Sequence, residues 1–267
     1  MGSAIVYAAI MMFGLLYRDF FAICALALLV QFLCVKEFFK LVAAIYPDEH
    51  FPRRVMWFTQ LAGLWLVLGV PAMAVSPQII ILFTVLPMSI LLCTVLGKKT
   101  CMVAGFTALV ALFYIALPMA CLITLRVNFH FAIPLALVLM IWTNDTMAYI
   151  VGSFIGKTPF SAISPKKTWE GTAGGALLTI AGAAVWAYLA PQSIKQLYGM
   201  ADWMVLALLA AVAGTAGDLL ESKLKRKAGL KDSGNIMPGH GGALDRFDSL
   251  LVTLPFAFCY ASLFMVK

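Results

Sequence analysis

The sequence predicts an all-α fold, a polytopic transmembrane helical bundle of about nine spans. Of its 267 residues, 63% are hydrophobic and only 12% are charged, and the mean hydropathy is +0.97. Soluble domains carry about 25% charged residues, so this composition excludes a water-soluble globular protein. Apolar runs of about 17 to 25 residues with very few charges, the length that crosses the hydrocarbon core, recur along the whole chain.

These apolar runs define the expected spans, and the acidic residues indicate which spans carry the site. The spans are expected at residues 3–17, 19–35, 56–75, 78–97, 101–125, 131–153, 172–190, 203–220 and 247–266. Seven of the twelve acidic residues gather in three patches after residue 131. We therefore expect a single membrane domain, in which residues 1–130 form scaffold spans and residues 131–267 form catalytic spans with their cytoplasmic loops.

The basic residues predict the orientation in the membrane. With nine spans, fifteen of the nineteen lysines and arginines fall on the side of the N-terminus and four on the opposite side. The positive-inside rule then places the charged loops in the cytoplasm, on the inner face of the plasma membrane. Because this bias accounts for the net charge of +7, no nucleic-acid partner is expected.

One acidic and basic patch lies at the end of the eighth apolar run. If the helix continues past residue 220, Asp218, Glu221, Ser222 and Lys225 share one face, at positions i, i+3, i+4 and i+7. A basic cluster that binds anionic lipid headgroups is the alternative. It would explain residues 223–227 but not the carboxylate of Asp218.

A second patch, PGHGGALDRFDS (residues 238–249), comes directly before the last span. It places His240, a glycine turn, Asp245, Arg246 and Asp248 at a helix start, where free backbone N–H groups favour an anion. The two carboxylates could instead cap the helix. Magnesium is bound through one or two carboxylates plus substrate phosphates, a role that suits Asp218 and Asp245.

The third patch runs from Asn144 to Gly175. Asp145 lies inside the sixth apolar run, where an ionised carboxylate costs at least ~2.5 kcal/mol, so it should face a cation or a polar cavity; a proton relay is the alternative. The run Ser164-Pro-Lys-Lys-Thr168 predicts the N-cap and first turn of a helix that binds phosphate. Ordinary positive-inside charge would also account for the lysines.

Two of these stretches carry a resemblance to a known family. SKLKR (222–226), KD (231–232) and PGHGGALDRFD (238–248), here called the signature segment (residues 222–248), closely resemble the signature of the phosphatidate cytidylyltransferases, or CDP-diacylglycerol synthases. SPKKTWEG (164–171), with Asp145 upstream, resembles that family's second recurrent stretch. The resemblance covers residues from about 140 to the end, and Met237 and Ala243 depart mildly from the pattern.

The resemblance implies an integral membrane enzyme that joins CTP and phosphatidic acid to give CDP-diacylglycerol and pyrophosphate. It also implies a requirement for Mg²⁺, with room for a second cation, and a homodimer. Its metal ligands map onto Asp218 and Asp245.

From the residues and the resemblance together we expect the following roles. Asp218 and Asp245 hold one or two cations, with Asp248 and Asp145 as further carboxylates. Lys225, Arg226 and Arg246 hold the triphosphate, Lys166 and Lys167 take the lipid phosphate or the pyrophosphate, and His240 orients a phosphate. The remaining expected substrate-binding residues are Ser164, Thr168, Ser222, Lys231, Asp232, Gly241 and Gly242.

Two other functions compete with this interpretation. An ion-coupled transporter could use Asp145 and Asp218 as ion-site residues, but it would favour an inverted repeat, whereas the acidic patches here occupy one half of the chain. A CDP-alcohol phosphatidyltransferase would carry a DGxxAR pattern, and this chain has no Asp-Gly pair.

Overall fold

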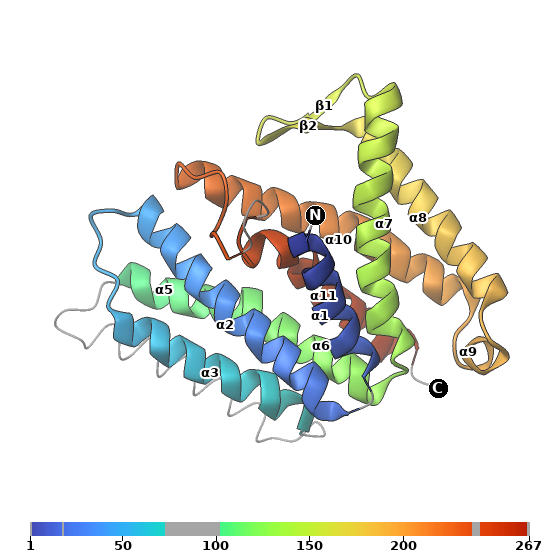
Figure 1. Cartoon of the computed structure of the whole chain (residues 1–267), viewed down its shortest axis with the longest axis horizontal. Helices are drawn as coiled ribbons and strands as arrows, with labels where there is room; N and C mark the ends of the chain where they lie inside the picture. Colours follow the sequence, from blue (N-terminus) through green and yellow to red (C-terminus); the bar gives the residue numbers. More distant parts are fainter. Residues whose placement is uncertain (1, 18, 73–101, 237–240, 266–267) are drawn as a thin grey trace. The chain divides into compact units, whose positions relative to one another are not determined.

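The computed structural model describes residues 2–17, 19–72, 102–236 and 241–265, and helices make up most of this part of the chain (Figure 1). The chain forms two compact units. The first comprises Met1–Phe131 and Leu224–Phe247, and the second comprises Ala132–Lys223 and Asp248–Lys267.

The first unit is built on the N-terminal helices. They are α1 (Gly2–Leu16), α2 (Phe20–Ile45), α3 (Arg53–Ala72), α5 (Met102–Ala111) and α6 (Leu117–Asn128). Helices α2, α3 and α6 pack against one another. Inside this packing Gln31 donates to the Oε1 of Gln60 at 2.7 Å, and Gln60 donates to the carbonyl of Phe32 at 2.9 Å. Both buried amides are therefore hydrogen-bonded, as burial of polar groups requires.

A π-helical turn joins α5 to α6. This turn, η1 (Leu112–Ala116), directly precedes Leu117 and Pro118. Proline has no N–H to continue the helical hydrogen-bond ladder, and π-turns are one way in which a helix accommodates such an interruption. The result is one apolar rod from Met102 to Asn128.

The second unit contains a tightly packed helical hairpin. Helices α7 (Ala132–Ile155) and α8 (Trp169–Leu189) lie side by side, and the strands β1 (Pro159–Ser161) and β2 (Ser164–Thr168) connect them (Figure 1). A Cβ atom at Gly175 would lie 2.8 Å from the Cβ of Ala148. The glycines of α8 therefore permit the close approach that is typical of membrane helices.

Three further helices complete the chain. They are α9 (Gln192–Leu197), α10 (Met200–Lys227) and α11 (Leu244–Phe264). The continuation of the eighth span past residue 220 is thus confirmed, because α10 runs to Lys227. The last residues of α10 and the first residues of α11 belong to the first unit, and the longer part of each helix belongs to the second.

Six of the described helices are long and apolar enough to cross a membrane: Phe20–Ile45, Met102–Asn128, Ala132–Ile155, Trp169–Leu189, Met200–Lys227 and Leu244–Phe264. The predicted all-α membrane protein is confirmed in this coarser form, with the two short strands as its only described sheet. The expected span 78–97 lies outside the described residues. The total of nine spans therefore stays a prediction.

Candidate functional site

The stretch from Ser164 to Thr168 forms a strand. The prediction that it begins a helix is wrong: β2 pairs antiparallel with β1, with Pro159 opposite Thr168 and Ser161 opposite Ser164. The helix begins later because Thr168 is the N-cap of α8, where its Oγ1 accepts a hydrogen bond from the backbone N–H of Gly171 at 3.1 Å. The Ser-Pro pair therefore does not mark the helix start, and Lys166 and Lys167 project from a β-hairpin.

Glu170 fastens this hairpin to the start of α8. Its carboxylate accepts hydrogen bonds from the backbone N–H of Lys157 at 3.1 Å, from the backbone N–H of Thr158 at 3.2 Å and from the hydroxyl of Thr158 at 2.8 Å. The carboxylate also lies in the first turn of α8, where negative charge complements the helix dipole. Glu170 thereby ties the segment between α7 and β1 to the start of α8. No sequence pattern gave Glu170 this role.

The hairpin brings Lys167 to the carboxylates of two helices. The ammonium of Lys167 forms an ion pair with Asp218 of α10, and Asp145 of α7 lies within electrostatic range of both. The side chains of Lys167 and Asp218 are 28% and 29% exposed. Such accessible pairs contribute at most about 1 kcal/mol to stability, so Lys167 can exchange its partner for an incoming phosphate at small cost.

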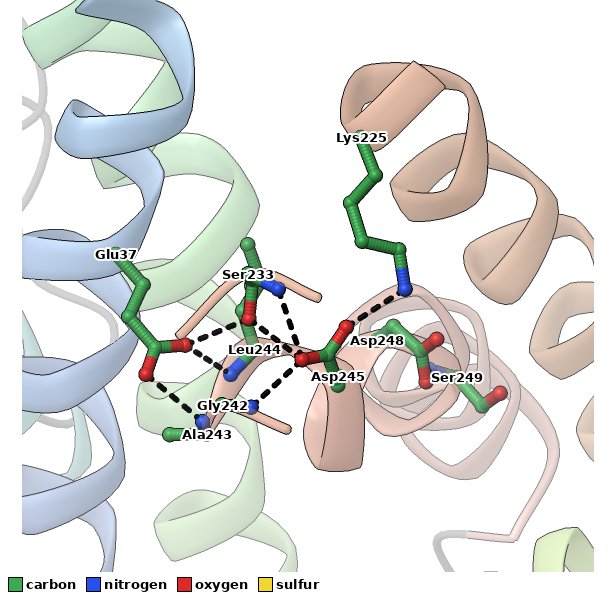
Figure 2. Close-up of polar contacts among 9 residues, drawn as sticks. All are labelled: Glu37, Lys225, Ser233, Gly242, Ala243, Leu244, Asp245, Asp248 and Ser249. Atoms are coloured by element: carbon green, nitrogen blue, oxygen red, sulfur yellow. Dashed lines mark hydrogen bonds and ion pairs between the residues drawn. The ribbon is translucent and has the colours of Figure 1, made fainter. Parts of the chain in front are cut away.

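Asp245 organises the end of the loop between α10 and α11 (residues 228–243), here the α10–α11 loop. Figure 2 shows its carboxylate between Lys225 on one side and Ser233 and Gly242 on the other. Oδ1 accepts from the ammonium of Lys225 at 2.6 Å, and Oδ2 accepts from the backbone N–H groups of Ser233 and Gly242 at 2.9 and 2.6 Å. The bond to Gly242, three residues earlier, is of the capping-box kind. The capping alternative therefore holds for Asp245 in this structure.

A second carboxylate at the same loop comes from the N-terminal part of the chain. Glu37 of α2 is only 4% exposed, and it accepts hydrogen bonds from the backbone N–H groups of Ala243 and Leu244 at 3.0 and 2.8 Å (Figure 2). It also accepts from the hydroxyl of Ser233 at 2.8 Å. Sequence reasoning missed Glu37, although a signal was present. Glu37 follows Cys34 by three residues and precedes Leu41 by four, which places it on the buried face of α2.

The carboxylates beside Lys167 fit the donor set that magnesium takes. Among the described residues, no group of three or more His, Cys, Asp and Glu side chains could hold a metal ion unaided. Magnesium needs only one or two carboxylates when substrate phosphates supply other ligands. Asp145 and Asp218 provide two oxygen donors against one lysine, and this leaves a net negative charge for a cation.

The other predicted residues are placed as follows. Asp218 belongs to the second unit and Asp245 to the first, so a metal site shared by these two stays a prediction. Asp248 is buried in α11, and its Oδ1 accepts from the backbone N–H of Ser249 at 2.6 Å. Gly241 has a φ of +82°, which favours glycine. His240 lies outside the described residues.

Five residues predicted to bind substrate have accessible side chains and lie outside the contacts of Lys167, Asp245 and Glu37 described above. Ser222 is half-buried on α10, and Ser164 is half-buried on β2. Three others are exposed: Arg226, Lys231 and Asp232. Their expected part in substrate binding stays a prediction.

These features define a class of protein. Among the described residues, helices long enough to span a membrane and the loops between them carry two lysine–carboxylate pairs, of which one is accessible and one is buried. Paired cations and carboxylates suit a site that handles phosphates and their metal ions. The class is an integral membrane protein that carries lysine–carboxylate clusters.

Sequence comparison identifies the family. The sequence model of the cytidylyltransferase family matches residues 1–264, and the chain belongs to that family. The chain is 44% identical over 126 residues to the phosphatidate cytidylyltransferase of Bacillus subtilis, a match that covers 47% of the chain and 45% of the relative. It is 41% identical over 125 residues to the phosphatidate cytidylyltransferase of Synechocystis, covering 47% of the chain and 41% of the relative.

A plant relative shows the same similarity. The chain is 37% identical over 138 residues to the chloroplastic phosphatidate cytidylyltransferase 5 of Arabidopsis thaliana, which covers 50% of the chain and 34% of the relative. The matched part thus spans less than half the length of each of these three relatives. Nothing in these comparisons favours a transporter.

Proposed function

We propose that this protein transfers the cytidylyl group of CTP to phosphatidic acid, giving CDP-diacylglycerol and pyrophosphate. The observation that carries the proposal is the cluster of Lys167, Asp145 and Asp218 in a membrane protein of the cytidylyltransferase family. The names of the similar proteins from three organisms support phosphatidate as the lipid substrate.

The chemistry requires two anions to meet. A phosphate oxygen of the lipid attacks the α-phosphorus of CTP, the bond between the α-phosphorus and its bridging oxygen to the β-phosphate breaks, and pyrophosphate leaves. A phosphate monoester is already nucleophilic near neutral pH, so the site needs no strong general base. Catalysis of this kind depends mainly on positioning and on neutralisation of charge.

Lys167 neutralises part of that charge. When a phosphate enters, its ammonium moves from Asp218 to the phosphate oxygens, and the accessible position of the pair allows this exchange. Lys166 lies next to it on the same exposed hairpin and adds a second positive charge. The hairpin keeps its place because Glu170 holds the backbone of Lys157 and Thr158.

Asp145 and Asp218 would hold Mg²⁺ together with the phosphates of CTP. When bound, the ion supplies charge neutralisation at the phosphates and helps to orient the triphosphate. The departure of Lys167 toward the substrate leaves both carboxylates for this role.

Two arginines at the helix ends that border the α10–α11 loop bind the nucleotide in this proposal. Arg246 follows Asp245 in the first turn of α11, and Arg226 follows Lys225 in the last turn of α10. The ion pair between Lys225 and Asp245 sets the distance between these two helix ends. The two arginines beside this pair are thereby held in a fixed frame.

The same proposal places the site on the cytoplasmic face of the plasma membrane. The connections between α7 and α8 and between α10 and α11, with the adjoining residues of α10 and α11, hold nine basic residues: Lys157, Lys166, Lys167, Lys223, Lys225, Arg226, Lys227, Lys231 and Arg246. The connection between α8 and α10 holds Lys195 alone. The positive-inside rule supports this orientation. We further propose that the protein acts as a homodimer.

The test is pyrophosphate release by the purified protein in detergent, given CTP, phosphatidic acid and Mg²⁺. Release that requires the lipid and yields a CDP-lipid on chromatography is the expected result, and removal of Mg²⁺ with a chelator should stop it. Release that is independent of phosphatidic acid, or no release from a folded sample, would contradict the proposed reaction.

A further inference from the structure

Glu37 is a buried carboxylate in a helix that the reaction does not otherwise involve. Its neighbours Lys36 and Lys40 point outward and are exposed, whereas Glu37 is 4% exposed. A buried carboxylate is costly unless hydrogen bonds compensate for the lost water. The described donors to Glu37 are two backbone N–H groups and one hydroxyl, all from residues about two hundred positions later in the chain.

The two backbone donors are those of a helix N-terminus. Ala243 and Leu244 immediately precede Asp245 and Arg246, and the first N–H groups of a helix have no partner within it. Glu37 accepts both of these N–H groups, and Asp245 accepts that of Gly242. Two carboxylates thus divide the donors at the start of α11 between them (Figure 2).

Ser233 links the two carboxylates. Its hydroxyl lies 2.8 Å from the Oε2 of Glu37 and 3.0 Å from the Oδ2 of Asp245. A hydroxyl carries one proton, so this proton is shared between the two acceptors. A substitution at Glu37 therefore alters the position of the Asp245 carboxylate, because both carboxylates bind Ser233 and the backbone of adjacent residues.

The loop leaves no spare room around Glu37. A Cβ atom at Gly234 would collide with the Glu37 carboxylate, and one at Gly242 would collide with that carboxylate and with the hydroxyl of Ser233. Glu37 therefore contacts the α10–α11 loop at two separate places, residues 233–234 and residues 242–243.

We propose that Glu37 is a positioning residue for cytidylyl transfer, which holds residues 233 and 242–244 so that Asp245 and Arg246 face the nucleotide in a fixed geometry. This inference rests on the proposed function and adds to it a residue from the N-terminal helices. Loss of such a residue lowers kcat more than it raises KM, because a displacement of about 1 Å in a catalytic group can cost about a hundredfold in rate.

The first measurement is hydrogen exchange of the purified protein without substrates. In Glu37→Gln the side chain has the same shape but one acceptor oxygen fewer. We expect the peptide that contains residues 241–247 to exchange at least about tenfold faster than in the natural protein, because one of its N–H groups loses its acceptor. Gln31→Leu is the matched control, because Gln31 is buried in the same helix but bonds to Gln60. It should leave exchange of residues 241–247 unchanged.

The second measurement is steady-state kinetics on the folded fraction. We expect Glu37→Gln to lower kcat by about 10–100-fold with the KM for CTP changed by less than about threefold. Glu37→Asp, which keeps the charge, should recover part of the rate, and Gln31→Leu should retain it. The inference would be overturned if Glu37→Gln had the same kcat as the unsubstituted protein and the same hydrogen-exchange rate at residues 241–247.

Failure of the proposed reaction and failure of the positioning role of Glu37 give different results. If the natural protein releases no pyrophosphate, the proposed reaction fails while the exchange experiment still tests the contact of Glu37 with the loop. If Glu37→Gln does not fold, Ser233→Ala takes its place, since it removes the shared hydroxyl and leaves both carboxylates. Faster exchange at residues 241–247 with a lower kcat would then support the inference, and no change in either would overturn it.

Discussion

The two lysine–carboxylate pairs described above differ in burial, and this difference predicts losses of stability of different size. Lys225 and Asp245 are 14% and 6% exposed, whereas Lys167 and Asp218 are 28% and 29% exposed. We compare the same substitution at the two sites, Lys225→Met and Lys167→Met. Each removes one positive charge and keeps a long apolar side chain.

The expected magnitude follows from what remains after each change. Removing one partner of a buried pair costs about 3–5 kcal/mol, because the other charge stays buried. Asp245 keeps its three hydrogen bonds to Ser233 and Gly242, so we expect a lower cost for Lys225→Met, about 2–3 kcal/mol. At about 3 °C per kcal/mol, its Tm falls by about 6–9 °C. Lys167→Met should cost at most about 1 kcal/mol and lower Tm by at most about 3 °C.

The protein carries its own reporters for this assay. Cys24, Cys34 and Cys121 are buried in the same unit as the Lys225–Asp245 pair, so a thiol-reactive fluorescent dye records the unfolding of that unit on heating. The double variant Lys225→Met/Asp245→Asn should regain part of the lost stability, because no charge is then left uncompensated. Equal Tm values for the two single variants, or a larger fall for Lys167→Met, would refute the reasoning from burial.

Three further changes test the site. Asp218→Ala should abolish pyrophosphate release while the protein stays in the membrane. Asp202→Ala, at the far end of the same helix, is the control and should remain active. Substantial activity in Asp218→Ala would remove this residue from the proposed metal site. Gly242→Ala should lower both Tm and kcat, since its Cβ collides with Glu37 and Ser233, and unchanged values would show that the loop adapts. Glu170→Gln should raise the KM for phosphatidic acid by about tenfold with little change in Tm, because it loosens the hairpin that carries Lys167. An unchanged KM would separate the hairpin from lipid binding.

The membrane helices follow closely from the sequence because hydrophobicity sets their extent. The predicted run 131–153 corresponds to α7 (Ala132–Ile155), and 172–190 corresponds to α8 (Trp169–Leu189). The predicted run 19–35 falls ten residues short of the end of α2, because Lys36, Glu37 and Lys40 interrupt the apolar stretch. A charge ends an apolar run in sequence, but a helix continues as long as its charged side chains reach water or a hydrogen-bond partner.

The candidate site was predicted in part, and its errors have a common cause. The sequence placed Lys167, Asp145 and Asp218 in one site, and the structure brings them together. The strand β2 was mistaken for a helix start because Ser-Pro occurs in both settings, and the pairing with residues 159–161 that decides between them is a tertiary contact. The contact of Glu37 with residues 243 and 244 spans more than two hundred positions, and no local pattern specifies it.

The bond between Glu37 and the start of α11 also constrains how the chain is made. Glu37 leaves the ribosome 206 residues before Ala243, a delay of about 10–40 s at typical rates of synthesis. During that interval water must solvate the carboxylate, so the end of α2 has to remain at the membrane surface until the last helix arrives. The hydrogen bonds of Glu37 are therefore completed only when synthesis is almost over.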